Sequence, residues 1–459
     1  MATNERSLPR HGFQNLTSPV QSRRELHDDM AAVQMKGFAE PVTAPSAALS
    51  RDQKLRRLVL LSFRNPFPAQ CMELSQVSDR KWRTLLHWLD VSGLALYFLD
   101  RLINLQLTHI LPEQVLARLR QNLQDNTERT HGMIAESMAI QEEFQADGVP
   151  YAVLKGFSLS PESVPKMEIR HQFDLDFLIA EDAVLTAQQV LKRQGYRLYA
   201  VSDKSWEFKK EEKVGISMED FYKDNSGRTV ELHLETRIAG AKSELDRAIE
   251  RDFYGIDMPV LSPLDLFLGQ GMHAYKHICG EFSRTAHLLE FYRHILMRGK
   301  DNVFWHELRL RGEGSPKVSL GIGMVTQLIT HVMGEFAPKE LTEWTVDKLP
   351  PAVLLWIKLH GPRAVFGEVP GSKLYLLLQR ELECFGNTTS RSQLGILLPR
   401  RLPPMVLLAS RDEGLWIRVR RYRVHMRYVL LRLRFHVIEG LRYGWEARRW
   451  KQHMEGITR

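Results

Sequence analysis

The spacing of apolar and polar positions changes twice along the chain. Residues 51 to 147 place apolar side chains three and four positions apart, as amphipathic helices do, with breaks at Asn65-Pro66 and Ser92-Gly93. Residues 149 to 240 instead contain short runs in which apolar and polar positions alternate, which is typical of strands. From Pro263 to about residue 440 the helical spacing returns. This pattern predicts a β/α centre between two helical regions.

We therefore expect an α+β protein, in which a small mixed β-sheet core is flanked by N-terminal and C-terminal helical regions. The first residues are rich in Ser, Pro, Asn and charged side chains, without sustained periodicity, which indicates disorder. The expected divisions are a disordered arm at 1–48, an N-terminal helical region at 49–147, an α/β core at 148–260, a C-terminal helical domain at 261–400 and a basic helical tail at 401–459.

Inside the core, alternation predicts strands at Tyr196–Ala200, Trp206–Lys209 and Arg228–Glu235. Asn225-Ser226-Gly227 is the expected turn between the last two strands. A helix is expected from Glu181 through Leu191.

Two aspartates stand one residue apart in the apolar run Phe173-Asp174-Leu175-Asp176-Phe177-Leu178-Ile179. This run has the features of a strand, and residues i and i+2 of a strand point to the same face, so both carboxylates project together. Their like charges repel and raise each other's pKa, and a divalent cation removes that conflict. Mg²⁺ and Mn²⁺ prefer such oxygen ligands. On spacing alone, two acids that simply face water remain an alternative.

Upstream, Lys155 and Gly156 end a short apolar strand, and Ser158 follows them. Glycine at such a turn lets the backbone approach a ligand closely, and exposed N–H groups with a nearby lysine suit a phosphate. Arg170 lies four residues before Asp174. It could hold a phosphate through two hydrogen bonds or pair with an acid of the cluster, and both interpretations stay open.

Downstream, Glu231, His233 and Glu235 share one face of an alternating strand. A third carboxylate at Glu231 would complete a two-metal cluster. His233 could bind metal, position an acceptor hydroxyl, or serve a structural role.

The order and spacing of these motifs resemble the uncharacterised bacterial nucleotidyltransferase family, within the DNA polymerase β-like nucleotidyltransferase superfamily. The resemblance covers roughly residues 55 to 340. The matching segments are Leu154-Lys155-Gly156, Arg170, Asp174-x-Asp176-x-Leu178-Ile179, Leu191-x3-Gly195-Tyr196, Val230-Glu231-Leu232-His233, Leu261-Ser262-Pro263-x-Asp265-Leu266 and His273-x2-Lys276-His277.

The resemblance implies a metal-dependent enzyme that transfers a nucleotidyl group from an NTP to an unidentified hydroxyl acceptor. Asp174, Asp176 and Glu231 would be its catalytic and metal-binding residues, with Mg²⁺ (or Mn²⁺) as cofactor. The nucleotide would be bound by the set Lys155, Gly156, Ser158, Arg170 and Lys276.

Two departures from the family pattern motivate an alternative. Phe157 separates Gly156 from Ser158 where the superfamily has Gly-Ser, and Glu231 stands where aspartate is common. A non-catalytic relative that binds nucleotides or acts as a scaffold is therefore a second hypothesis.

His273 and His277 are four residues apart on an expected helix and so share a face. Zinc peptidases use this spacing, but the segment lacks the glutamate that acts as their base, and we reject that interpretation. Lys276 and His277 could approach a nucleotide phosphate or have capping and packing roles.

Composition restricts the class of protein further. Cys71, Cys279 and Cys384 are far apart and form no C-x-x-C motif, which argues against a structural zinc site or a disulfide framework and favours the cytoplasm. The first residues contain no apolar run typical of a secretion signal, and no stretch approaches the ~20 apolar residues of a transmembrane segment.

The positive charge is concentrated in the expected tail. The whole chain carries +8, while residues 400–459 contain 15 Lys and Arg against 5 Asp and Glu. Residues 416–434 interleave arginines with Trp416, Leu430, Leu431 and Leu433. This stretch could contact an anionic surface such as nucleic acid or membrane, but its aliphatic content favours packing against the helical domain.

Overall fold

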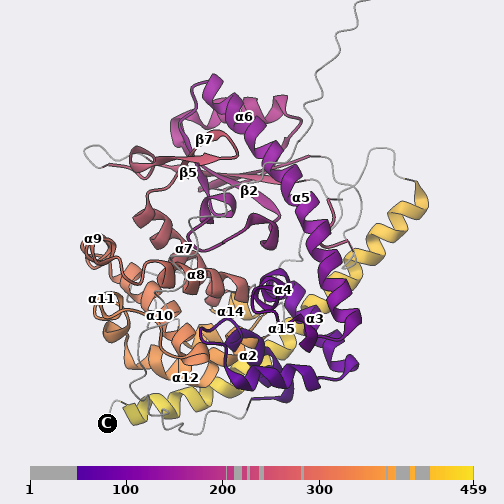
Figure 1. Cartoon of the computed structure of the whole chain (residues 1–459), viewed down its shortest axis with the longest axis vertical. Coiled ribbons are helices and arrows are strands. Elements are labelled where there is room, and N and C mark those ends of the chain that lie inside the picture. Colours follow the sequence, from indigo (N-terminus) through magenta and orange to yellow (C-terminus); the bar gives the residue numbers. More distant parts are fainter. Residues whose placement is uncertain are drawn as a thin grey trace, which may run out of the picture. The chain divides into compact units, whose positions relative to one another are not determined.

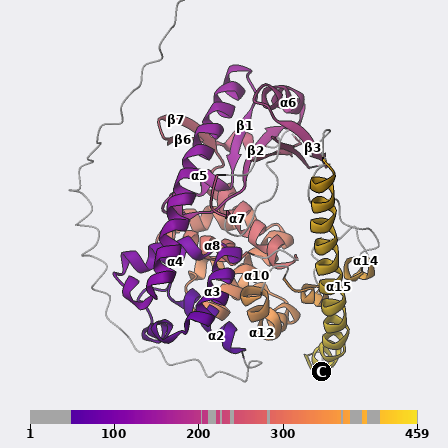
Figure 2. The same cartoon turned by 90° about the vertical axis from the view of Figure 1, so that its right-hand side faces the viewer.

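The computed structural model describes most of the chain beyond residue 48 (Figures 1 and 2). The described residues are 49–202, 204–210, 220–224, 228–236, 242–280, 284–367, 371–378, 393–398 and 414–457. The expected arm at 1–48 and the expected turn Asn225-Ser226-Gly227 lie outside them. Contacts group Ala47–Arg459 into one compact unit, so the finer divisions expected within it stay predictions.

The region before the sheet is helical, as predicted, with α2 (Arg51–Leu61), α3 (Asp79–Ser92), α4 (Ala95–Asn104) and α5 (Glu113–Ala146). Ser50 starts α2 with a reciprocal cap, in which its hydroxyl accepts from the Gln53 backbone while the Gln53 side chain accepts from the Ser50 backbone. Gly93 ends α3 with φ of +77°, a conformation that glycine adopts without steric cost. Local signals therefore explain where these helices begin and end.

The described strands form one mixed sheet in the order β3-β4-β5-β2-β1-β7-β6. Their bounds are β1 (Tyr151–Leu154), β2 (Asp174–Ala180), β3 (Arg197–Val201), β4 (Ser205–Lys209), β5 (Thr229–Glu235), β6 (Ile249–Phe253) and β7 (Ile256–Val260). β2 runs parallel to β5 and antiparallel to β1. The sequence analysis predicted β1 to β5 but not β6 and β7. The charged centre of β6, Glu250-Arg251-Asp252, hides its strand character but is ordinary for a strand at a sheet edge.

The sheet turns one face toward the helices that precede and follow β2. Phe144 of α5 packs on Tyr151 and Phe177, with ring centroids 5.3 and 5.4 Å apart respectively. The predicted helix after β2 is confirmed as α6 (Val184–Arg193), entered through a 3₁₀ turn at Glu181–Ala183. Because side chains alternate along a strand, Asp174 and Asp176 lie on the face opposite Phe177.

Helices again follow the sheet, as predicted. They are α7 (Pro263–Ile278), α8 (Thr285–Met297), α9 (Asn302–Gly312), α10 (Pro316–Met333), α11 (Lys339–Thr342), α12 (Pro351–Phe366), α14 (Gln393–Leu397) and α15 (Leu415–Ile457). Ser262 caps α7 by accepting from the Asp265 backbone, and Pro263 occupies the first turn, where its missing N–H costs nothing. Among the described residues, no helix combines the length and the apolar content that crossing a membrane requires.

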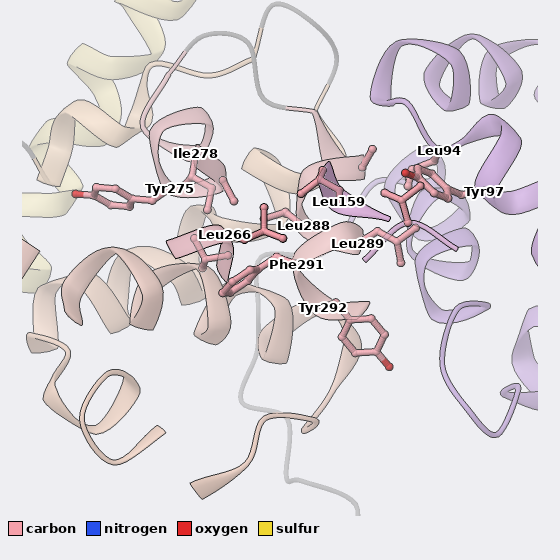
Figure 3. Close-up of a cluster of buried hydrophobic side chains, with 14 of the residues drawn as sticks. Leu94, Tyr97, Leu159, Leu266, Tyr275, Ile278, Leu288, Leu289, Phe291 and Tyr292 are labelled. Carbon is pink, nitrogen blue, oxygen red and sulfur yellow. The ribbon is translucent and has the colours of Figure 1, made fainter. Parts of the chain in front are cut away.

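A shared hydrophobic core joins the helices that precede the sheet in the sequence to the helices that follow it (Figure 3). Leu94 and Tyr97, at the start of α4, belong to this core together with Leu159 and Leu289, and all four side chains are buried. Leu159 belongs to the 3₁₀ turn Gly156–Leu159 that follows β1. The N-terminal helices therefore share one core with the turn that carries Lys155 and Gly156.

In the part of the tail that the structure describes, residues 414–457, Leu415–Ile457 form a helix as predicted, but the apolar residues in its first half are not packed as we expected. Leu430, Leu431 and Leu433 are 58%, 64% and 58% exposed, and Trp416 is 84% exposed. Burial begins only further along α15, where His436, Glu439 and Trp450 are buried. Contacts such as the one from the Ser372 hydroxyl to Glu439 (3.0 Å) hold that second half, so the packing interpretation is wrong for residues 416–434.

Candidate functional site

The predicted carboxylates meet where β2 and β5 lie side by side (Figure 1). The register pairs Asp176 directly with Glu231, and Asp174 with Thr229. His233, two residues beyond Glu231 on the same face, joins the two acids. Its Nε2 lies 2.9 Å from Asp176 Oδ1 and 3.4 Å from Glu231 Oε2. Parallel pairing of two alternating strands therefore brings these three side chains into one cluster.

Lys155 adds a positive charge to this cluster. Its Nζ lies 2.8 Å from Asp176 Oδ1 and 3.4 Å from His233 Nε2. The Lys155 backbone has φ of +50° and ψ of −148°, a conformation that costs a non-glycine residue about 1–3 kcal/mol. The chain thus turns sharply after β1, and this turn aims the lysine at the carboxylates.

The residues after Lys155 maintain the turn. Gly156 has φ of +39°, a conformation that other residues rarely adopt, and a Cβ there would lie 2.8 Å from Gln172 Oε1, so any other residue would be strained at this position. Ser158 is fully buried, and its hydroxyl donates to the Lys155 carbonyl at 2.7 Å. The Ser158 hydroxyl is therefore committed to the turn itself.

Arg170 lies in a buried network beside the acids. Its Nε donates to Glu290 of α8 at 3.0 Å, and its Nη1 donates to Gln172 Oε1 at 2.7 Å. The Tyr97 hydroxyl also donates to Glu290, at 2.8 Å. Burial by itself lowers the pKa of Arg170, but the charges of Glu290, Tyr97 and Asp174 and the hydrogen bond to Glu290 together raise it above its usual value. Both interactions fix the guanidinium of Arg170, which lies four residues before Asp174 and six before Asp176 in the sequence.

Lys276 stands apart from the carboxylates in the chain, on α7, and its side chain is exposed. Its effect on the neighbourhood is electrostatic, since its charge is one of the causes that lower the pKa of His273. The structure brings together Lys155, Asp174, Asp176, Glu231 and His233. Ser158 and Arg170 instead bond to neighbouring residues, Ser158 to the Lys155 carbonyl and Arg170 to Gln172 and Glu290.

The acids of the cluster have opposite pKa shifts. The surrounding protein displaces part of the water near the Asp174 carboxyl, and this raises its pKa to about 6. The negative charge of Asp176 adds to the rise. The residue nevertheless stays accessible to solvent. The bond to His233 instead lowers the pKa of Glu231 to about 2. Burial lowers the pKa of His233, but its bonds to Asp176 and Glu231 outweigh burial and raise it. Positive charge is therefore favoured at the centre of the cluster.

A divalent cation fits this set of donors. The ligand atoms of Asp176, Glu231 and His233 lie within 4.8 Å of one another. Lys155 and His233 both direct their nitrogens at one oxygen of Asp176, so the Lys155 ammonium already lies at the position that the acids favour for a cation. Carboxylate oxygens with few other donors suit Mg²⁺ or Mn²⁺.

Sequence reasoning missed three residues that surround the site. Gln172 closes over Gly156, Glu290 holds Arg170, and His287 of α8 lies beside His273 and His277. Gln172 lies in the segment between β1 and β2 and had no pattern to mark it. Glu290 and His287 are on a helix more than a hundred residues away from β2 in sequence, so only tertiary packing reveals them.

Comparison with known proteins shows which family this chain belongs to. The antibiotic-resistance factor ANT(2'')-Ia has a similar solved structure, with 12% identity over 40% of this chain and 94% of its own, at a TM-score of 0.30. A nucleotidyltransferase-like protein from Paracoccidioides brasiliensis has 12% identity over 45% of this chain and 94% of its own, at a TM-score of 0.26. No curated protein matches the chain. Residues 78–332, more than half of the chain, match the family described as uncharacterised nucleotidyltransferase, and this chain therefore belongs to that family.

Proposed function

We propose that this protein is a metal-dependent nucleotidyltransferase that moves a nucleotidyl group from an NTP to a hydroxyl acceptor. The observation that carries the proposal is the register of β2 and β5, which sets Asp176 opposite Glu231 beside Asp174. The family match supports nucleotidyl transfer as the reaction class. The metal, the NTP and the hydroxyl acceptor are the parts that we add.

Asp174, Asp176 and Glu231 would hold Mg²⁺ (or Mn²⁺). When bound, the metal neutralises the charge that develops on the phosphates during transfer. The high pKa of Asp174, about 6, indicates that this carboxyl lacks a sufficient counter-charge by itself. Glu231, whose pKa is about 2, stays ionised across the physiological range. The pair therefore offers one permanently charged ligand and one that ionises fully when a cation is near.

Lys155 would bind the triphosphate. Its side chain is 31% exposed, so the ammonium can leave Asp176 and turn toward an entering phosphate. The strained backbone at Lys155 and the missing Cβ at Gly156 let the main chain approach the same ligand. Ser158 would act by holding the Lys155 carbonyl, and Arg170 by fixing Gln172 over Gly156. Lys276 would add positive charge from α7.

His233 would position the acceptor side of the site. It bridges Asp176 and Glu231, and its raised pKa keeps it able to donate a hydrogen bond near neutral pH. A group that donates there stabilises negative charge on a neighbouring oxygen. A sugar, a protein hydroxyl, an antibiotic or an RNA end would each present the required oxygen.

The test is metal-dependent NTP binding and turnover by the full chain. We expect NTP binding only with Mg²⁺ or Mn²⁺, and we expect a labelled product when labelled NTPs are incubated with cell extract. Glu231→Gln should lose both activities while folding normally. Glu250→Gln is the matched control, because Glu250 is an exposed glutamate of β6 in the same sheet. Metal-independent NTP binding, or full activity of Glu231→Gln, would contradict the proposed site.

A second candidate function rests on the exposed first half of α15. Arg418, Arg420 and Arg423 are exposed there alongside Trp416 and Leu431. Arginines interleaved with exposed apolar side chains suit an anionic surface, and we propose such a contact for residues 416–434. Binding to vesicles with anionic lipid or to RNA should fall steeply with salt, and salt-insensitive binding would refute it.

A further inference from the structure

Three histidines gather on α7 and α8, outside the carboxylate cluster. The ring centroids of His273, His277 and His287 are 4.5 to 4.7 Å apart in all three pairs. One ring nitrogen from each lies within 4.8 Å of the others. Among the described residues, the only other group of potential metal ligands with this closeness is Asp176, Glu231 and His233.

One buried ring nitrogen of this group lacks a hydrogen-bond partner. His287 is only 9% exposed, and its Nδ1 is buried without a partner. Leaving a buried polar atom unsatisfied costs free energy, and a bond to a metal ion would satisfy a buried ring nitrogen.

Unsatisfied histidine nitrogens alone do not identify a site. His171, His294 and His425 also leave one ring nitrogen without a partner. None of them belongs to a group of potential ligands, and His171 instead stacks on Phe221 with ring centroids 4.2 Å apart. The convergence of three rings is what separates His287 from these three.

Positive charge surrounds the three histidines. Lys155 and Arg170 lower the pKa of His273, and Arg284 lowers that of His287. On the same helix as His287, Glu290 already accepts bonds from Arg170 and Tyr97. A dication here would repel the neighbouring cations unless an anion accompanied it. The surroundings therefore favour an anionic oxygen ligand beside the three nitrogens.

We propose that His273, His277 and His287 bind one transition-metal dication of the Zn²⁺ class, leaving a fourth position for an anionic oxygen ligand. Three histidines with one open position are a recurrent arrangement for Zn²⁺, with Zn–N bonds of about 2.0–2.1 Å. Bonds of that length need nitrogens about 3.3 Å apart, so metal binding would draw together rings whose nitrogens now lie within 4.8 Å of one another. Histidine nitrogens select Zn²⁺ over Mg²⁺, so this site differs in metal from the carboxylate cluster.

A series of hydrogen bonds and contacts connects the three-histidine site to the proposed nucleotidyl site. Glu290, one turn after His287 on α8, binds Arg170, which binds Gln172 above Gly156. An anion in the fourth position would therefore stand near the residues proposed to hold the NTP. Because α7 lacks a glutamate next to His273, the site does not have the base of a zinc peptidase.

The experiment measures metal retention and Co²⁺ absorption by the full chain. Protein stripped with a chelator is loaded with Zn²⁺ or Co²⁺ and desalted, and bound metal is counted by mass spectrometry. We expect one retained Zn²⁺ per chain and, with Co²⁺, the strong visible absorption of a four-coordinate site. His273→Gln and His287→Ala should each weaken binding by more than the 10–100-fold that loss of a supporting group costs.

Two controls separate this site from the proposed nucleotidyl site. Asp176→Asn should lose metal-dependent NTP binding but keep the Co²⁺ absorption, and His306→Ala, at an exposed position of α9, should change neither. Inorganic phosphate should alter the Co²⁺ absorption by entering the fourth position. Absence of retained metal in the wild type, an unchanged spectrum in a folded His273→Gln variant, or no response to phosphate would overturn the proposal.

Discussion

Replacing Asp174 and Asp176 by asparagine, one at a time, should move the stability of the metal-free protein in opposite directions. Asp176 is buried and accepts from Lys155 at 2.8 Å and His233 at 2.9 Å. Asparagine keeps the shape but removes the charge that both partners need. Breaking a fully buried pair costs about 3–5 kcal/mol. Because the Lys155 side chain is 31% exposed, solvent screening reduces the expected loss in Asp176→Asn to about 2 kcal/mol.

Asp174→Asn should instead stabilise the metal-free protein. The pKa of Asp174 is raised from 3.8 to about 6, so the folded protein loses stability as pH rises from 3.8 through 6. Fully shielded from water, that shift would correspond to about 3 kcal/mol above pH 6. Asp174 is solvent-accessible, however, and screening leaves an expected gain of about 1 kcal/mol.

Urea denaturation at about pH 7.5 in the presence of a chelator, followed by circular dichroism, measures both changes. Repeating it below about pH 4 should remove the advantage of Asp174→Asn, because the wild-type carboxyl is then protonated in both states. Both variants should lose metal-dependent NTP binding. Equal destabilisation of the two variants, or a more stable Asp176→Asn, would refute the assigned roles of the two carboxylates.

Two further substitutions test the turn and the tail. Gly156→Ala should lower the free energy of unfolding by about 1–2 kcal/mol, because φ is +39° and the new Cβ would meet Gln172. Gly269→Ala is the control and should be neutral or stabilising, since the space around its Cβ is open. Thermal melts in which the two variants are equally stable would contradict this packing. Trp450→Ala should cost about 3 kcal/mol at a buried position of α15, whereas Trp416→Ala, 84% exposed, should leave the melting temperature unchanged and weaken anionic-vesicle binding. A melting temperature that falls equally in both tryptophan variants would show that the first half of α15 is packed in solution.

Much of the candidate site follows from the sequence because it depends on short-range geometry. Two-residue alternation places Asp174 and Asp176 on one face of a strand in any fold that contains that strand. The same rule places Glu231 and His233 together. Helix limits such as Ser50 and Gly93 are likewise set by hydrogen bonds within a few residues.

The tail shows that an apolar pattern in the sequence does not by itself predict burial. Leu430, Leu431 and Leu433 predict an apolar helix face, and the helix exists, but these side chains are exposed. Periodicity specifies that a face is apolar, while burial depends on whether another element reaches that face. In α15, the segment that includes Ser372 reaches the second half at Glu439, and that contact has no local signature in the sequence.

The sequence by itself determined strands β1 to β5 and the helices around them, the pair of aspartates and the reaction class that their motifs resemble, but not β6 and β7. Only the tertiary structure decided that β2 and β5 are parallel neighbours, which sets Asp176 against Glu231. It alone decided that Ser158 faces inward and that His287 joins His273 and His277. The physical reason is that side-chain direction follows from local backbone periodicity, whereas strand neighbours and helix packing follow from burial of apolar surface contributed by distant parts of the chain.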